Sequence, residues 1–225
     1  LRNIAGVANP AQIQLPTCTN GATPQVSAVL LLTQDHEAAE RALRSLGEFG
    51  GEAGAAEVIL ILGAPSSEMR DLVARCEGPR VIETTANCGT AAAWNIGFAA
   101  AGADQVLLMH EDAALRAGTL AAMHAALADD PEIAVCGPRL IEGDEIGSDS
   151  ESVTGGGWIY SQRFTGGLPV PPEAHPDSGV LPVDLVSSAC SLWRRSAWQS
   201  LGGFDERRYP ASGVDADATI GVRAL

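Results

Sequence analysis

The chain has 225 residues, of which 46% are hydrophobic and 19% charged, with a mean hydropathy of +0.09. This length and balance suit one large globular core, or at most two small ones. The net charge of -14 argues against non-specific binding to nucleic acid or to an anionic membrane. No lysine occurs, so arginine and the termini supply every fixed positive charge.

The cysteines indicate a reducing compartment. Their number is odd and no C-x-x-C pair occurs, which favours reduced cytosolic thiols over a disulfide framework or a zinc site. Two of them lie in segments that we expect in the core, Cys88 and Cys136. The full set is Cys18, Cys76, Cys88, Cys136 and Cys190.

The sequence shows no membrane or targeting signal. No apolar run approaches the roughly 20 residues of a transmembrane helix, and the polar start of the chain is unlike a signal peptide. We therefore expect a cytoplasmic protein, with a peripheral position at the inner membrane face as an option. Because the chain ends inside a helical pattern, we expect the natural protein to continue beyond Leu225.

Residues 1–25 lack clear periodicity and are predicted to form an N-terminal arm. Apolar strands then alternate with helices of about a dozen residues, which indicates βαβ units and a parallel sheet. The strands are predicted at 26–32, 57–62, 81–82, 105–109 and 133–136. The helices are predicted at 35–46, 66–76, 88–101 and 117–127. The continuous apolar strands predict burial on both faces of the sheet.

The pattern becomes mixed after about residue 137. A polar, Gly-rich stretch is followed by a hairpin strand at 158–164 and a proline-rich loop at 169–182. A strand is predicted at 183–193, a short helix at 195–201 and a tight turn at 202–205. No internal repeat is present, so residues 26–225 are predicted to form a single domain.

The most informative residues are His110, Glu111 and Asp112, which end the buried strand at 105–109. Acidic groups at the carboxyl end of such a strand lie where open α/β sheets bind ligands. Carboxylates there suit a divalent cation and the phosphates that it carries. Taken alone, Asp112 could equally be a helix cap, and His110 could simply be hydrogen-bonded to a carboxylate.

Two asparagines mark the helix before that strand. Asn87 can cap the helix, and Gly89 would allow a ligand to approach closely. Asn95 follows about two turns later. A cap does not explain a polar Asn95 inside an alanine-rich helix.

Further polar residues follow a strand of small residues near the end of the chain. Arg194 and Arg195 precede a GGFDE turn, and Asp215 and Asp217 precede Arg223. Such groups are ordinarily solvated surface. A carboxylate in a partly dry cleft can instead act as a general base toward a hydroxyl.

Taken in order, these segments resemble the family 2 glycosyltransferases, which have the GT-A fold. The matching stretches are NCG (87–89), NIG (95–97), LLMHED (107–112), VSSACSLWRRSAW (186–198), LGGFDE (201–206) and DADATIGVR (215–223). The resemblance covers residues 26–225. It implies an α/β, Rossmann-like, mostly parallel sheet flanked by helices, with a nucleotide-sugar half at 26–136 and a mixed acceptor half at 137–225. A rhamnosyltransferase-like subgroup is an option within the family.

The resemblance also implies roles for the acidic residues. Asp112 would bind Mn²⁺ or Mg²⁺, with His110 as a candidate second ligand where many members have Asp. The catalytic base would be Asp217 or Asp215. The helix spacing to Arg223 favours Asp217, whereas matching the D-x-D pattern gives Asp215, and the acid that normally precedes the base is absent in both registers.

The remaining matched positions would bind substrate. The family usually has an Asp after the second strand that holds the nucleotide base, but no acid occurs there, which leaves Thr33 and Asp35 as side-chain candidates. The acceptor side would include Trp158, Tyr160 and Trp193. The full set of implied substrate-binding residues is Thr33, Asp35, Asn87, Gly89, Asn95, Glu111, Ser188, Trp193, Arg194 and Arg223.

The implied activity is inverting transfer of a sugar from a nucleotide-diphosphate sugar to a hydroxyl of a glycan, glycolipid or small-molecule acceptor. A pyrophosphorylase would show a Gly-rich, Arg-containing loop after the first strand, and a nicotinamide dehydrogenase would show G-x-G-x-x-G. Neither pattern occurs. The altered metal triplet and the degraded acidic motif leave one alternative, a non-catalytic GT-A-like binding or scaffold subunit.

Overall fold

The structure of the chain is a computed structural model. The structure describes residues 11–18, 22–84, 86, 88–142, 152–155, 158–160, 167–169, 179–210 and 212–224.

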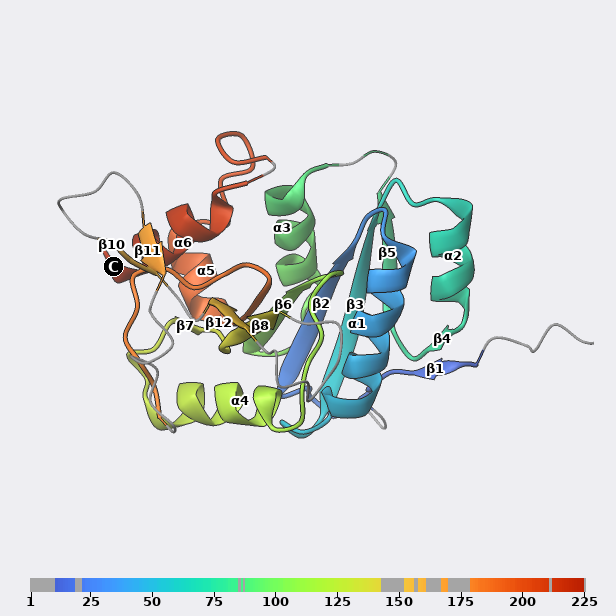
Figure 1. Cartoon of the computed structure of the whole chain (residues 1–225), viewed down its shortest axis with the longest axis horizontal. Coiled ribbons are helices and arrows are strands. Elements are labelled where there is room, and N and C mark those ends of the chain that lie inside the picture. Colours follow the sequence, from blue (N-terminus) through green and yellow to red (C-terminus); the bar gives the residue numbers. More distant parts are fainter. Residues whose placement is uncertain are drawn as a thin grey trace, which may run out of the picture.

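A six-stranded sheet forms the centre of the molecule (Figure 1). Its strands follow the spatial order β5-β3-β2-β6-β12-β7. The first four are parallel, and β12 runs antiparallel to both β6 and β7. The bounds are β2 (Val26–Leu32), β3 (Ala56–Gly63), β5 (Arg80–Thr84), β6 (Gln105–His110), β7 (Val135–Cys136) and β12 (Cys190–Arg194). The predicted α/β class with a mostly parallel sheet is confirmed.

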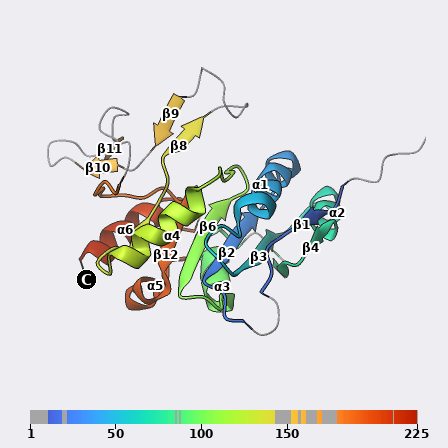
Figure 2. The same ribbon diagram turned by 90° about the horizontal axis from the view of Figure 1, so that it is seen from below.

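Helices cover both faces of this sheet, and Figure 2 shows α1 and α3 on opposite sides of the strands. One hydrophobic cluster joins the sheet to α1, α2 and α4, and a second joins it to α3, α5 and α6. The helices are α1 (His36–Phe49), α2 (Ser67–Ala74), α3 (Thr90–Ala100), α4 (Thr119–Asp129), α5 (Arg195–Leu201) and α6 (Val214–Arg223). None of the helices that the structure describes is long and apolar enough to cross a bilayer.

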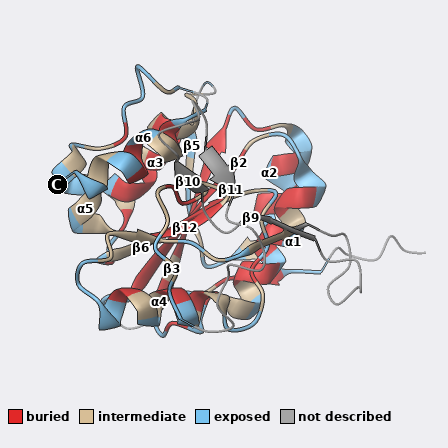
Figure 3. Ribbon diagram, turned by 60° about the vertical axis from the view of Figure 1, so that its left-hand side comes forward, coloured by how far each residue is buried: buried red, intermediate tan, exposed pale blue. Residues whose placement is uncertain are grey.

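The strand pleat explains how the apolar strands serve both clusters. In β2, Leu30 and Leu32 point to the first cluster while Val29 and Leu31 point to the second. Successive side chains of a strand face opposite sides. Because helices cover both faces of this sheet, all seven residues of β2 are buried. Figure 3 shows the central strands as buried and the helices with one exposed face.

Three two-stranded sheets complete the described structure. β1 (Ile13–Gln14) pairs in parallel with β4 (Cys76–Glu77). β8 (Leu140–Glu142) pairs with β9 (Ser152–Gly155), and β10 (Trp158–Tyr160) pairs with β11 (Gly167–Pro169), both antiparallel. β10 covers the start of the hairpin strand predicted at 158–164, whose residues 161–164 lie outside the described residues, as do residues 170–178 of the predicted proline-rich loop.

Part of the predicted N-terminal arm packs on the core. Ile13 and Leu15 are each 3% exposed and belong to the first hydrophobic cluster. Their amides donate to the carbonyls of Arg75 and Glu77. Two apolar residues at alternate positions, one in β1 and one just after it, therefore anchor this segment beside α1. Such a pattern is too short to be recognised as periodicity.

One strand and one helix begin later in the chain than the sequence predicts. The strand expected at 183–193 begins only at Cys190, because the Ser187 hydroxyl accepts from the Ala189 amide and turns the chain there. The helix expected from Cys88 begins at Thr90, with Gly89 rather than Asn87 at its N-cap.

All five cysteines are free thiols, as predicted. Cys190 is buried and Cys136 is half-buried, on the same side of the sheet, and burial raises the pKa of each thiol to about 12. Protonated thiols in apolar surroundings react slowly. These two cysteines are therefore packing residues.

We expect Leu15→Ala to lower the free energy of unfolding by about 2–5 kcal/mol, because truncation leaves a cavity in the first cluster. The adjacent Gln14 is exposed, so Gln14→Ala should change it by less than about 0.5 kcal/mol. Urea unfolding of both variants measures the difference. Equal midpoints for the two variants would contradict the inclusion of this segment in the core.

Candidate functional site

The strand order places the candidate site at the carboxyl ends of β2 and β6. From β2 the chain proceeds to β3 and β5 on one side and then returns to β6 on the other, so the strand order reverses between β2 and β6. Open α/β sheets bind ligands at such a switch point. Thr33 and Asp35 follow β2 there, and His110 ends β6. Leu31 and His110 are paired in register, so the loops that follow β2 and β6 begin at the same edge of the sheet.

Glu111 joins the two loops that leave these strands. Its carboxylate accepts from the amide of Thr33 at 2.5 Å and from the Thr33 hydroxyl. It also accepts from the amides of Gln34 at 3.3 Å and Asp35 at 3.4 Å. The Asp35 carboxylate in turn caps α1, accepting from the amides of Glu37 and Ala38. Glu111 therefore holds the loop that carries Thr33 and Asp35.

His110 lies half-buried between the sheet and α3. Its ring meets Trp94 edge-on, with the centroids 5.1 Å apart, and its amide donates to the Ala189 carbonyl. Burial lowers the pKa of His110, although the carboxylates of Asp112, Glu111 and Asp215 act to raise it. The imidazole is therefore mainly neutral at pH 7, the form that can ligate a cation.

Trp94 is a site residue that the sequence interpretation did not identify. It is 1% exposed, and its indole N–H has no hydrogen-bond partner within the described residues. The Trp94 ring packs edge-on against His110 and also against Phe204, whose ring centroid is 5.8 Å away. A tryptophan inside an alanine-rich helix next to Asn95 was the available signal.

Asp112 is exposed just beyond the carboxyl end of β6. Within the described ranges, no three His, Cys, Asp or Glu side chains gather as a metal site. One carboxylate and one neutral imidazole fit a different case, in which a Mg²⁺-like cation takes one or two protein ligands and completes its shell with substrate phosphates and water.

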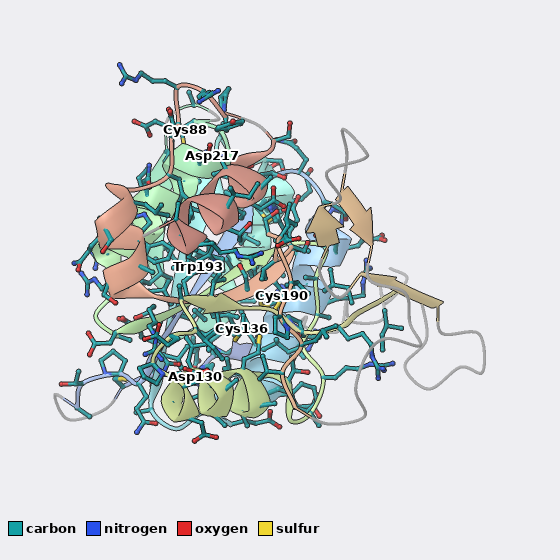
Figure 4. The ribbon with its side chains drawn as sticks, turned by 90° about the vertical axis from the view of Figure 1, so that its left-hand side faces the viewer. Cys88, Asp130, Cys136, Cys190, Trp193 and Asp217 are labelled. Carbon is teal, nitrogen blue, oxygen red and sulfur yellow. The ribbon has the colours of Figure 1, made fainter. Side chains whose placement is uncertain are left out.

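The two candidate bases have different surroundings, although both lie at the start of α6. Asp215 is half-buried, and its carboxylate accepts from the amides of Ser188 at 3.3 Å and Ala216 at 2.9 Å. Its charge also reaches His110. Asp217 is exposed on α6 (Figure 4). Among the predicted residues, Asp215, Ser188, His110 and Asp112 are thus brought to one corner.

Asn95 lies outside this corner, and its side chain is occupied. The amide nitrogen donates to the Phe204 carbonyl at 2.9 Å, and the amide oxygen accepts from the Phe204 amide at 2.9 Å and the Trp198 indole at 3.1 Å. These bonds join α3 to the GGFDE turn. They account for a polar residue in that helix.

Trp193 and Arg194 also serve the interior of the fold. Trp193 is 2% exposed on β12 (Figure 4), and its indole donates to the Ser191 hydroxyl. The Arg194 guanidinium donates to the carbonyls of Leu127, Asp130 and Ile133. It thereby satisfies carbonyls at the C-terminal end of α4, where a positive charge also complements the helix dipole.

The last two matched positions hold chain segments together. Arg223 forms an ion pair with Asp184 and donates to the Val183 carbonyl, which ties the end of α6 to the chain before β12. Gly89 has φ 82°, and a Cβ there would lie 2.0 Å from the Pro210 carbonyl oxygen. The predicted substrate-binding residue Asn87 lies outside the described residues.

The end of β3 has no acid, as the sequence indicates, and the chain turns there at Ala64, which has φ 50°. The Thr84 hydroxyl, at the end of β5, lies within hydrogen-bond distance of the carbonyls of Ala86 at 2.8 Å and Leu62 at 3.1 Å.

Solved structures with a similar fold include a mannosyltransferase. A mannosyltransferase from Pyrobaculum calidifontis in complex with GDP-Man and Mn²⁺ has TM-score 0.60 and 18% identity, over 88% of this chain and 51% of that chain. Residues 1–349 of S. aureus TarS give 0.62 and 14%, over 88% and 55%. GalNAc-T7 with UDP, GalNAc and Mn²⁺ gives 0.65 and 13%, over 90% and 41%. The chain thus spans about half the length of these proteins or less.

Among curated proteins, none matches the chain significantly. The sequence profile of glycosyl transferase family 2 matches residues 34–197, well over half of the chain, from the loop after β2 to α5. The chain therefore belongs to glycosyl transferase family 2.

Proposed function

We propose that this chain transfers a glycosyl group from a nucleotide-diphosphate sugar to an acceptor hydroxyl, in one inverting displacement, with Asp215 as the general base. The observation that carries the proposal is the position of Asp215. Its half-buried carboxylate accepts from the Ser188 amide, and the carbonyl of the next residue, Ala189, accepts from the His110 amide at the end of β6. These bonds place the carboxylate near the switch point of the sheet.

The donor would lie over the carboxyl ends of β2 and β6. Thr33 and Asp35 belong to the loop that Glu111 holds in place, and a rigid loop there can contact the nucleotide base and ribose through main-chain groups. The mannosyltransferase from P. calidifontis was solved with GDP-Man, and GalNAc-T7 with UDP and GalNAc. These complexes support a nucleotide sugar as the class of donor.

Asp112, with His110 as a second ligand, would hold a divalent cation that arrives with the diphosphate. Such an ion, when bound, neutralises the charge that develops on the departing nucleotide. Burial lowers the pKa of His110, which supports this role because only the neutral imidazole ligates a metal. The three amides around Glu111 leave that carboxylate committed to the protein.

In the proposed reaction, Asp215 accepts the proton of the acceptor hydroxyl as its oxygen attacks the anomeric carbon. The bond from that carbon to the diphosphate oxygen breaks, and its electron pair leaves with the nucleoside diphosphate. Attack from the face opposite the leaving group inverts the anomeric configuration. The Ser188 amide keeps the carboxylate oriented toward the acceptor.

The surroundings of the two acids favour Asp215 over Asp217, although the helix spacing to Arg223 favours Asp217. Asp217 is exposed to solvent, where a carboxylate gains no orientation from neighbouring groups. Asp215 lies between Ser188 and the His110 corner. A base must be within hydrogen-bond reach of the reacting hydroxyl, so position outweighs sequence register.

We expect Asp215→Asn to lower kcat by about 10²–10⁴-fold, the usual contribution of a general base, and to leave donor affinity unchanged. Asp217→Asn, the matched control on the same helix, should retain activity. The donor is first chosen from a panel of UDP-, GDP- and dTDP-sugars by nucleoside diphosphate release. The reverse pattern would assign the base to Asp217.

The same assay separates an enzyme from a binding subunit. Donor binding by calorimetry, combined with no nucleotide release from any donor in the presence of sugar or lipid acceptors, would support the non-catalytic alternative. Turnover by the unmodified chain would exclude it.

We expect donor binding to be tighter with Mn²⁺ than with EDTA, and Asp112→Asn to remove that difference because it removes the carboxylate ligand. Asp71→Asn, an equal charge change at an exposed position of α2, should bind the donor like the unmodified chain. Calorimetric titration of each protein, with and without metal, measures the effect. Retention of the metal dependence in Asp112→Asn would contradict the proposed cation site.

A further inference from the structure

We propose that Asn95 is a positioning residue, which holds the chain segment 204–210 along α3 and thereby places Asp215 in the site. The inference rests on the proposed role of Asp215 as the base. It gives α3 a structural role in the acceptor half of the molecule.

Asn95 binds the main chain of Phe204 as a neighbouring strand would. Its side-chain amide forms hydrogen bonds with both the N–H and the C=O of that residue, each at 2.9 Å. The Trp198 indole donates to the same amide oxygen at 3.1 Å. Three of the four hydrogen bonds that an asparagine side chain can form are therefore used within the protein.

The turn before Phe204 has the geometry that this contact needs. Gly203 has φ 91°, and a Cβ there would come within 3.1 Å of the Asn95 amide oxygen. The Phe204 ring is 5% exposed and packs on Phe98 and Trp193, with centroids 5.6 Å and 5.5 Å away. The start of the segment is thus fixed by main chain and side chain together.

The end of the segment is fixed to the beginning of the same helix. The amide of Thr90 donates to the Pro210 carbonyl at 2.9 Å. Gly89 allows this approach, since any Cβ there would meet the same carbonyl oxygen. Segment 204–210 is therefore attached to α3 at both ends, one turn and a half apart along the helix.

The attached segment ends four residues before α6, the helix that carries the proposed base. Gly213, with φ 82°, is the N-cap of α6, and Val214 is 3% exposed. Asp215 is then the second residue of that helix, with its carboxylate on the Ser188 amide. Release of Phe204 from Asn95 would free the chain that sets the start of α6.

Asn95→Asp tests the inference with an isosteric change. The carboxylate can still accept from the Phe204 and Trp198 N–H groups, but it repels the Phe204 carbonyl to which the amide donates. We expect faster hydrogen exchange in residues 204–214 and a fall in kcat of about 10²-fold, the loss that a displacement near 1 Å can cause. Donor affinity should stay unchanged, and in the Asp215→Asn background Asn95→Asp should cause no further loss.

Gly203→Ala provides a second route, because its Cβ would displace the same turn while Asn95 is intact. It should reproduce the exchange pattern and the fall in kcat. Gly118→Ala is the matched control: Gly118 also has positive φ, 79°, but a Cβ there meets nothing within 4 Å. That control should lose some stability and keep kcat.

Three results separate the possibilities. Equal losses of rate from Asn95→Asp with and without Asp215→Asn would overturn the inference alone, since Asn95 would not act through Asp215. Unchanged kcat despite faster exchange in residues 204–214 would also overturn it. Full activity of Asp215→Asn by itself would overturn the proposed function and this inference together.

Discussion

The pairing of β2 with β3 on one side and β6 on the other is the constraint on which the rest of the structure depends. Every residue of β2 is buried, and alternate residues belong to opposite hydrophobic clusters. A shift by one residue would exchange the two faces along the whole strand. The register that places Leu31 beside His110 is therefore tightly specified. It is this register that brings the loops of Thr33 and Glu111 into contact.

Much of the fold could be predicted because its signals are local. Continuous apolar strands alternating with amphipathic helices specify a parallel sheet, and Asp35 and Ser66 mark helix starts that the structure reproduces. The N-terminal strand escaped prediction since only Ile13 and Leu15 carry its pattern. The strand before Arg194 was predicted too long because a serine hydroxyl interrupts it.

The site was less predictable, because sequence motifs do not reveal which partner a polar side chain takes. Asn95, Arg194 and Glu111 stand in motifs associated with substrate, yet each binds main-chain groups of a distant segment. Trp94 belongs to no motif and lies beneath His110. The choice between Asp215 and Asp217 depends on the rotation of α6 and the place of Ser188, neither of which the helix spacing specifies.

The close approach of Gly89 to Pro210 has an evolutionary consequence. A side chain at position 89 would collide with a carbonyl more than a hundred residues further along the chain, and Asn95 meets Phe204 across a similar separation. Both contacts are to main-chain groups, so they constrain positions 89 and 95 whatever side chains stand at 204 and 210. Relatives with the same chain path should therefore keep a glycine at 89 and an amide side chain at 95. The NCG and NIG motifs therefore depend on the main chain of a segment more than a hundred residues further along.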